Sequence, residues 1–375
     1  MPLMPDKLSQ QRADPAPSPT PSRATQVRWS WPGFSQLPAP LLGAALGLTG
    51  LAAAWRLAME TGLGGPADGG GGVVVDALCW LAVAVTALIW AGYGLKMLRH
   101  RVLFLADLRD AGTAPYLGTV PMTLMLLPLA APVAGAGLPV WPAVWPAVWL
   151  AGAVLQPVVA LVMGHWLVRR MPRAVPLTPA WFVPIAGMFA APAAGVPLGY
   201  PTLSAMLLVM GTGAWLLLLL PVARSLRRFS RHDRSSGLRP GALPVTLVPS
   251  LFVLAAPPAL VARGLWAFGV WAEVQAVLTV LACLTALAVL GYVLWRRQDI
   301  AADMRHFGFS PRWWAMSFPL AASASAAVTL HSMGGTAWTA LGALAMLGLA
   351  STAIAVLGVA TAAWLTRLPR GRQRP

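Results

Sequence analysis

The residues that most often carry covalent or metal chemistry are few in this sequence and stand far apart. Cys79 and Cys283 each lie within an apolar run, and His165 and His331 have no carboxylate or cysteine near them in the sequence. A metal site or a catalytic group needs several such side chains to converge. No phosphate-binding loop of the GxxxxGK[ST] type occurs in the sequence. The pattern predicts no enzyme activity, no catalytic residue, no metal and no cofactor.

The sharpest local feature is an aromatic residue beside a helix-breaking one. Phe318 precedes Pro319 within the run 313–322, and small residues follow. A proline removes one backbone donor and bends its helix, which would re-aim the neighbouring ring. Two interpretations are open at this point: Phe318 plugs a narrow neutral pore, or it is a packed core phenylalanine.

The composition indicates the environment of these residues. The chain of 375 residues is 58% hydrophobic and 10% charged, whereas a soluble domain carries about 25% charged residues. Most of the surface must therefore face lipid. The net charge of +16 fits the basic cytoplasmic loops of a membrane protein, and we expect no nucleic-acid partner.

Spans of the bilayer can be counted because a crossing helix needs about 20 apolar residues. Ten segments meet this length, and they predict an all-α polytopic membrane protein with ten transmembrane helices. In chain order the segments are Pro38–Met59, Val73–Leu98, Leu117–Ala136, Ala143–Val168, Thr178–Val196, Gly199–Ala223, Pro240–Ala262, Trp266–Trp295, Pro311–His331 and Gly335–Leu365.

The chain ends are polar. Residues 1–37 are rich in Pro and Ser and lack the apolar region of a cleavable signal peptide, so we expect a disordered cytosolic tail. Residues 38–366 form the predicted transmembrane domain, and residues 367–375 form a basic cytosolic tail.

The basic residues predict the orientation. With a cytoplasmic N-terminus, every Lys and Arg except Arg56 and Arg263 falls on the inner side. A bias of this size sets topology and requires an even number of spans. We therefore expect both termini in the cytoplasm.

The prolines divide the segments into two classes. The odd-numbered segments contain 15 prolines and the even-numbered segments contain 4. A broken helix is tolerated only against protein or a watered cavity, so this pattern favours an inner ring of five kinked helices inside an outer ring. The general abundance of Pro and Gly in membrane helices is the alternative explanation. The predicted kinks lie at Pro128, Pro132, Pro184, Pro192, Pro249, Pro257, Pro258 and Pro319. The first segment has Gly43, Gly47 and Gly50 instead, which allow close helix approach.

The charges within the segments favour passive anion movement. No Asp or Glu lies in the middle of an odd segment, and such residues usually mark proton relays. Arg56 and Arg263 end two of the predicted inner helices on the outer side. Each could attract an anion into an outer vestibule or extend to lipid phosphate.

Several runs resemble the tellurite-resistance/dicarboxylate transporter family, which includes TehA-type bacterial proteins and plant slow-type anion channels. The runs are 42–58 in the first segment, 178–187 in the fifth, 255–259 in the seventh and 313–319 in the ninth. Two departures are Met188, where the family commonly has Asn, and residues 106–110, where it commonly has Glu followed by His-Pro.

The resemblance implies five helical hairpins in a quasi-five-fold ring around a central pore, a homotrimer in which each subunit conducts, and a phenylalanine gate at the position of Phe318. The leading hypothesis is an anion channel or facilitative carrier of the bacterial inner (plasma) membrane, with membrane lipid and small inorganic or organic anions as its partners. The alternatives are a proton-coupled exporter of dicarboxylate, sulfite or tellurite-related oxyanions, and a non-transporting membrane scaffold or membrane-embedded enzyme.

Overall fold

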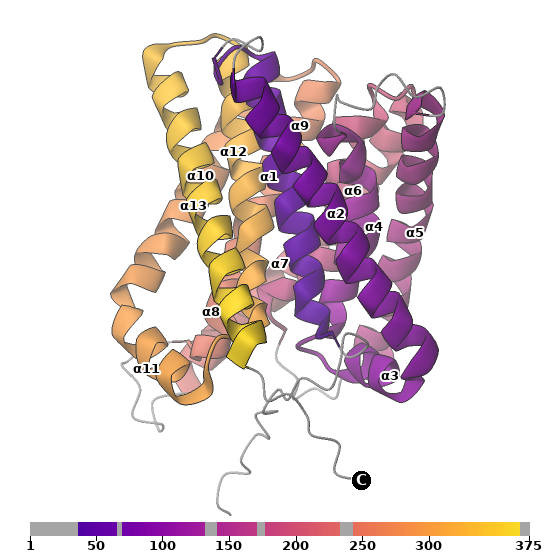
Figure 1. The fold of residues 1–375 in the computed structure, drawn as a ribbon, viewed down its shortest axis with the longest axis vertical. Helices are drawn as coiled ribbons and strands as arrows, with labels where there is room; N and C mark the ends of the chain where they lie inside the picture. The colour runs from indigo at the N-terminus through magenta and orange to yellow at the C-terminus, as the bar shows by residue number, and fades with distance from the viewer. Residues whose placement is uncertain (1–36, 66–69, 132–140, 171–176, 233–242, 368–375) are drawn as a thin grey trace, which may run out of the picture.

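The computed structural model describes residues 37–65, 70–131, 141–170, 177–232 and 243–367, and every regular element within these ranges is a helix (Figure 1). Apart from Leu37 and Arg367, the two predicted tails lie outside the described residues. The α-helices are α1 (Leu42–Glu60), α2 (Gly70–Arg99), α3 (Arg101–Arg109), α4 (Thr119–Leu126), α5 (Trp141–Arg170), α6 (Val183–Gly195), α7 (Pro201–His232), α8 (Val248–Leu251), α9 (Ala256–Ala267), α10 (Ala272–Trp295), α11 (Arg297–Phe307), α12 (Ser317–Ser332) and α13 (Ala337–Arg367). The three-ten turns are η2 (Ala39–Leu41), η3 (Ala114–Gly118), η4 (Leu127–Ala130), η5 (Pro179–Phe182), η7 (Val245–Leu247), η8 (Phe252–Ala255) and η9 (Pro311–Met316).

Seven helices in the described ranges are long and apolar enough to cross a membrane, and an eighth is added if one bent pair forms a single span. The bent pair is α3 with the stretch Ala114–Ala130, at an angle of 104°. Residues Pro179–Gly195 form a shorter apolar helix. The molecule is therefore an all-helical, multi-pass membrane protein.

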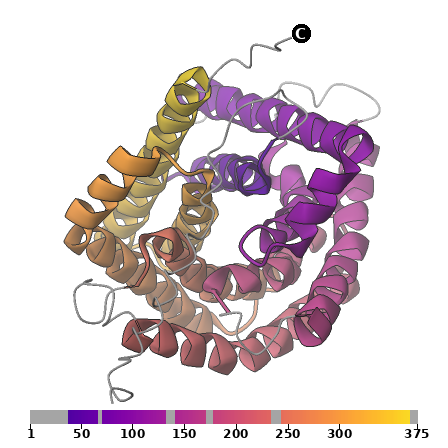
Figure 2. The ribbon, with the colours of Figure 1, turned by 90° about the horizontal axis from the view of Figure 1, so that it is seen from below.

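The exposure of the helices alternates along the chain. In the most apolar part of each helix, 83% of the residues are buried for Ala39–Glu60 and 72% for Val245–Ala267, against 22–33% for α2, α5, α7, α10 and α13. Nearly every residue of α6 and most residues of α4 and α12 are also buried. In Figure 2 the exposed helices lie on the outside and enclose the buried ones. The odd segments thus lie inside, as the proline pattern predicts.

The helices contact one another in a regular order. Each buried helix packs against the exposed helix that follows it: α1 on α2, α4 on α5, α6 on α7, α9 on α10, and α12 on α13. The buried helices also contact each other in a closed series, from α1 to α4, α6, α9, α12 and back to α1. The center of the molecule is therefore formed by five different segments of the chain.

Prolines determine how these inner segments begin. A proline lacks the N–H that would bond to the carbonyl four residues earlier, so that carbonyl needs another donor. In η5 the Ala180 carbonyl accepts instead from Val183, three residues on, because Pro184 follows. In η8 the Val253 carbonyl accepts from Ala256 ahead of Pro257. The three-ten turns at the start of the inner helices therefore satisfy carbonyls that proline leaves free.

The predicted kink prolines accordingly occupy the starts of elements more often than helix interiors. Pro184, Pro249, Pro257, Pro258 and Pro319 lie in the first turn of α6, α8, α9 and α12. Pro128 lies in η4, and Pro192 lies inside α6. Pro132 falls outside the described residues.

Glycines allow α1 to approach η9 and α12 closely. A Cβ added at Gly43 would stand 3.3 Å from the Cβ of Trp314, and one at Gly47 would stand 2.5 Å from the Cβ of Ser317. The Ser317 hydroxyl donates to the Trp314 carbonyl at 2.7 Å. There is no room for a larger residue on this face of α1, which fixes the position of Phe318 one residue beyond Ser317.

We predict that Gly47→Ala lowers the free energy of unfolding by about 1–3 kcal/mol, because the added methyl overpacks a closed contact. Thermal unfolding of the purified protein in detergent measures the change. Gly94→Ala is the matched control, because a Cβ at Gly94 meets nothing within 4 Å and alanine favours helix. Equal stability of the two variants would contradict the close approach.

Candidate functional site

The buried helices surround a central cavity. It is narrow and partly open, with about 30 Å³ of space that a water molecule can enter. Its lining comes from all five inner segments and is almost entirely apolar: Gly43 and Leu46 from the first, Tyr116, Thr119 and Met122 from the second, Ala180, Val183 and Ala186 from the third, Val253 and Ala256 from the fourth, and Trp314, Ala315, Phe318 and Pro319 from the fifth. The cavity lies at the beginning of each of these segments, where the three-ten turns are.

Phe318 lies in the wall of this cavity and is 6% exposed. Its side chain belongs to a core cluster shared with Leu46 of α1, Met122 of α4 and Ala186 of α6. The ring also faces Gly50, where an added Cβ would stand 2.9 Å from its Cδ2 atom. Phe318 therefore contacts the other inner helices at the place where they converge.

The cavity lining has no formal charge. None of its residues is Asp, Glu, Lys, Arg or His, and its polar side chains are those of Thr119 and Tyr116. The Thr119 hydroxyl is used internally, because it donates to the Tyr116 carbonyl at 2.6 Å. The lining offers small apolar surfaces and backbone to a passing solute.

Arg56 forms an ion pair at the other end of α1. Its guanidinium donates to Asp76 of α2 at 3.1 Å and to Cys79 Sγ at 3.4 Å. The two charged side chains are 17% and 27% exposed. Much of the positive charge of Arg56 is therefore balanced by a neighbouring carboxylate.

Arg263 lies at the corresponding end of α9 without an ion-pair partner among the described residues. It is 9% exposed and its guanidinium lies over the Trp266 ring at 4.2 Å. Its Nη1 atom has no hydrogen-bond partner. Glu60 acts on it electrostatically but forms no ion pair with it. Of the two arginines predicted for the outer vestibule, Arg263 is therefore the one whose charge is not paired with a carboxylate of the described residues.

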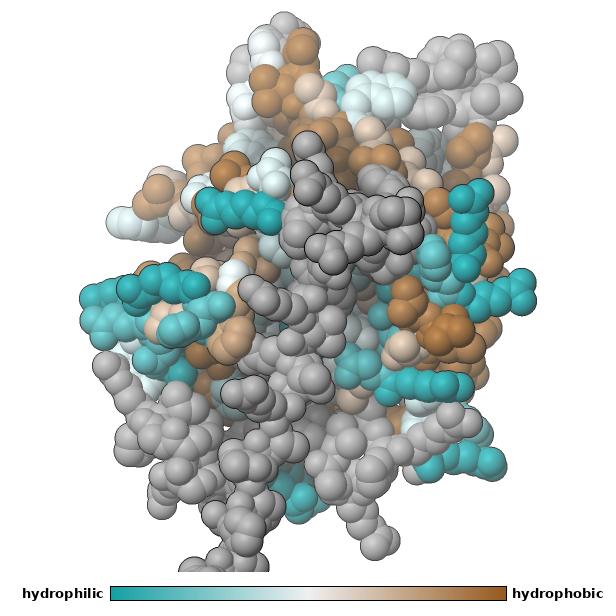
Figure 3. Space-filling model, turned by 60° about the horizontal axis from the view of Figure 1, so that its bottom comes forward, coloured by the Kyte–Doolittle hydropathy of each residue, from teal (hydrophilic) through white to brown (hydrophobic). Residues whose placement is uncertain are grey.

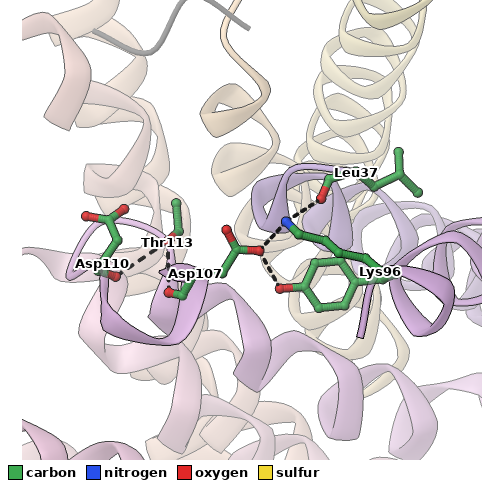
Figure 4. A network of polar contacts seen from close by, with 6 residues as sticks. Leu37, Lys96, Asp107, Asp110 and Thr113 are labelled. Atoms are coloured by element: carbon green, nitrogen blue, oxygen red, sulfur yellow. Dashed lines mark hydrogen bonds and ion pairs between the residues drawn. The ribbon is translucent and has the colours of Figure 1, made fainter. Parts of the chain in front are cut away.

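Sequence reasoning missed a buried charged network at the opposite end of the molecule. Lys96 of α2 is 4% exposed, pairs with Asp107 of α3 and donates to the Leu37 carbonyl at 3.0 Å (Figure 4). The Tyr93 hydroxyl donates to the same carboxylate at 2.8 Å. The network ties the start of the first inner segment to the corner between α2 and α3. The spacing of Tyr93 and Lys96, one turn apart, is the signal that could have found it.

Gln156 was also missed. It lies in α5, is completely buried, and donates from Nε2 to the Pro184 carbonyl of α6, while its Oε1 atom has no partner. The side chain lies against Gly187, where a larger residue would collide with it. A polar residue in an otherwise apolar outer span was the available signal, since such residues usually face protein.

The described residues offer little for metal or acid-base chemistry. No group of three or more His, Cys, Asp or Glu side chains converges within these ranges. Cys79 and Cys283 are free thiols, and His331 Nδ1 is 3.0 Å from the Thr339 hydroxyl.

Comparison with known proteins places this geometry in a family. A family model described as SLAC1, voltage-dependent anion channel, matches residues 36–366. The match covers all of the described helices except the last residue of α13. None of the curated proteins compared with the chain matches it.

We predict that Asp76→Asn lowers the free energy of unfolding by about 1–3 kcal/mol, because Arg56 then keeps a half-buried charge without its carboxylate. The shift in thermal unfolding in detergent gives the value. Asp303→Asn removes the same charge from α11, where Asp303 forms no ion pair with a described residue, and should change stability by less than about 0.5 kcal/mol. An equal effect of the two substitutions would show that the Arg56–Asp76 pair is not stabilising.

Proposed function

The chain belongs to the voltage-dependent anion channel (SLAC1) family, and from this membership we propose that it passes small anions passively through a neutral pore gated by Phe318. Membership of this anion channel family supports a role in anion transport. The passive mode, the gate and the residues that assist the anion are our proposal. The solutes we consider are chloride- or nitrate-like ions, oxyanions and C4-dicarboxylates.

One observation supports the proposal most strongly. Residues from five inner segments converge on one uncharged cavity, and the ring of Phe318, which lines it together with Tyr116 and Trp314, packs where these segments meet. A pore without fixed negative charge does not favour cations. The abundant basic residues on the inner side raise the local concentration of anions at that end of the pore. Selectivity for anions then needs no charged residue in the pore itself.

The surroundings of Phe318 suit a gate. Pro319 has no N–H to donate to the carbonyl of Ala315, four residues earlier. The regular α-helix therefore cannot continue from Pro319 back to Ala315. Gly50 leaves just enough space for the ring on the facing helix. A rotation of the ring away from α1 would open the cavity toward the far side without moving a charge or breaking a hydrogen bond.

The proposed architecture has ten spans in a quasi-five-fold ring with both termini in the cytoplasm of a bacterium, and it assembles as a homotrimer in the inner membrane. Fewer than ten helices of the described residues are long and apolar enough to be recognised as membrane spans, and there is a physical reason. A helix that faces protein and a pore needs no apolar surface toward lipid. The segment η9–α12 contains Ser317, Ser323, Ser325 and Thr329, and all but Ser325 are buried.

The main alternative is a proton-coupled exporter of dicarboxylate, sulfite or tellurite-related oxyanions. Such coupling usually relies on a buried carboxylate or histidine near the substrate path, and the lining of the described cavity has neither. Flux that follows a pH gradient while the anion gradient is held at zero would favour the exporter.

We predict that Phe318→Ala increases anion efflux from proteoliposomes by on the order of tenfold, which corresponds to about 1.4 kcal/mol of barrier. Gly50→Ala should also increase efflux, because its methyl displaces the ring. The control is Phe252→Ala, which truncates a fully buried phenylalanine that is not part of the cavity lining. Unchanged efflux for Phe318→Ala, with normal insertion, would reject the gate.

We predict that Arg263→Gln reduces anion flux about two- to fivefold at low ionic strength, with the difference shrinking as salt screens the charge. Arg56→Gln serves as the comparison, because Asp76 already balances that charge, and it should change flux less. Rates of anion uptake measured at several salt concentrations distinguish the two. A larger effect of Arg56→Gln would assign the vestibule role to Arg56 instead.

A further inference from the structure

Two outer helices of the molecule are repeats of one pattern. Along α2 and α10 most of the buried positions recur at a constant separation of 200 residues, and a buried basic residue stands at or just after the end of each helix. The matched pairs are Val75 and Gln275, Cys79 and Thr279, Ala82 and Ala282, Thr86 and Ala286, Ile89 and Val289, and Lys96 and Arg296. The two helices therefore present the same faces to the interior and to lipid.

The buried basic residues make the same contacts. Lys96 donates to the carbonyl of Leu37, the residue before Pro38, and pairs with Asp107. Arg296 donates to the carbonyl of Leu243, the residue before Pro244, at 2.8 Å. It also pairs with Asp299 at 2.6 Å, and its Nη1 atom donates to the hydroxyl of Tyr292 at 3.1 Å. Each residue thus fixes the start of the inner segment of its own hairpin.

A short helix follows each of these residues at the same end of the molecule. α3 follows Lys96 and α11 follows Arg296, and both lie at the lower end in Figure 1, well apart from each other. We name residues 97–109 the α2–α3 corner and residues 294–307 the α10–α11 corner.

Both corners expose large apolar side chains. In the α2–α3 corner Leu98 is 66% exposed and Val102 is 81% exposed. In the α10–α11 corner Trp295 is 49% exposed and Phe307 is 63% exposed. These surfaces continue the exposed apolar faces of α2 and α10, which face lipid.

Arginines accompany the apolar side chains in both corners. They are exposed, and none of them forms an ion pair with another described residue: Arg99, Arg101 and Arg109 in the first corner, and Arg297 and Arg305 in the second. Two carboxylates of these corners, Asp107 and Asp299, are already paired with the buried Lys96 and Arg296, whereas Asp303 of α11 remains as one acidic neighbour in the second corner. Figure 3 shows hydrophilic side chains beside apolar ones on both sides of this end. Each corner therefore combines free positive charge with apolar surface at the edge of the lipid-facing wall.

We propose that the two corners are matched binding sites for acidic phospholipids, with the arginines on the headgroup phosphate and the apolar side chains among the acyl chains. A short amphipathic helix of this kind lies in the membrane interface, and each Lys or Arg near an anionic leaflet contributes about 1 kcal/mol. Continuity with the lipid-facing helices favours a lipid over an acidic protein segment. The proposal rests on the proposed function in one respect, the orientation of the chain, which puts both corners in the cytoplasmic leaflet.

The sites are connected to the interior. A lipid held on α3 or α11 restrains Asp107 or Asp299, and through Lys96 or Arg296 it restrains the start of the first or the seventh segment. The acidic-lipid content of the membrane would thereby affect the inner helices that surround the cavity.

The test is lipid retention by the purified full-length chain, measured by native mass spectrometry during titration with phosphatidylglycerol or phosphatidylcholine. Two double variants each remove two positive charges from one corner: Arg101→Gln/Arg109→Gln from the α2–α3 corner and Arg297→Gln/Arg305→Gln from the α10–α11 corner. Each pair should weaken phosphatidylglycerol binding at its corner by roughly 25-fold, from about 1 kcal/mol for each arginine. Combining the two pairs should remove both high-affinity lipids.

The matched control is Arg227→Gln/Arg367→Gln, which removes the same charge from the ends of α7 and α13, outside both corners. It should change phosphatidylglycerol affinity less than twofold. Retention at the wild-type level by the corner variants, an equal loss in the control, or equal binding of phosphatidylcholine would each overturn the proposal. So would corner variants that keep phosphatidylglycerol but lose a polyglutamate peptide, since that result would assign the corners to an acidic protein. No anion flux enters the measurement, so its failure leaves the proposed channel activity unaffected.

Discussion

The structure depends on the satisfaction of backbone carbonyls inside a membrane. A carbonyl that loses its helical donor to proline cannot face lipid without a cost of several kcal/mol, so proline-rich segments must lie inside. In this chain they begin with three-ten turns that supply a donor one residue earlier, as at Ala180 and Val253. The same turns stand around the central cavity. The rule that keeps broken helices away from lipid therefore also gives the cavity its wall of small residues and backbone.

Much of this arrangement could be predicted from the sequence, because it follows from the solvent. Composition predicts a multi-pass helical protein, and the unequal distribution of prolines predicts which segments are buried. The exact placement of the prolines could not be predicted in this way: Pro184 and Pro319 lie in first turns, where a missing N–H costs little, and the kinks are changes of helix type. Whether a proline bends a helix or stands at its start depends on how neighbouring segments pack, and the sequence of one segment does not contain that information.

The polar contacts were harder to predict because they join residues distant in sequence. Arg56 and Arg263 look equivalent as isolated basic residues, yet one pairs with Asp76 and the other stacks on Trp266. In the sequence Lys96 is one of many inner-side basic residues, whereas in the structure it is buried and donates to the Leu37 carbonyl. Its match with Arg296 becomes visible only when burial is compared between hairpins. The distribution of basic residues predicts an orientation in the membrane, whereas tertiary structure decides which charges are paired.

On this interpretation the cavity between the broken helices is part of a water-filled path that the ring of Phe318 closes. Substituted-cysteine accessibility tests it directly, in a background with Cys79 and Cys283 replaced by Ala. Cysteines placed at Ala256 and Ala315, which line the cavity, and at Val277, which faces outward on α10, would be treated with a charged thiol reagent from one side of the membrane. If the Phe318 ring closes the path, cysteines at Ala256 and Ala315 are modified rapidly and the one at Val277 is not, and modification from the opposite side occurs only when Phe318 is truncated. Cavity positions that stay unreactive from both sides, with or without Phe318, would contradict it.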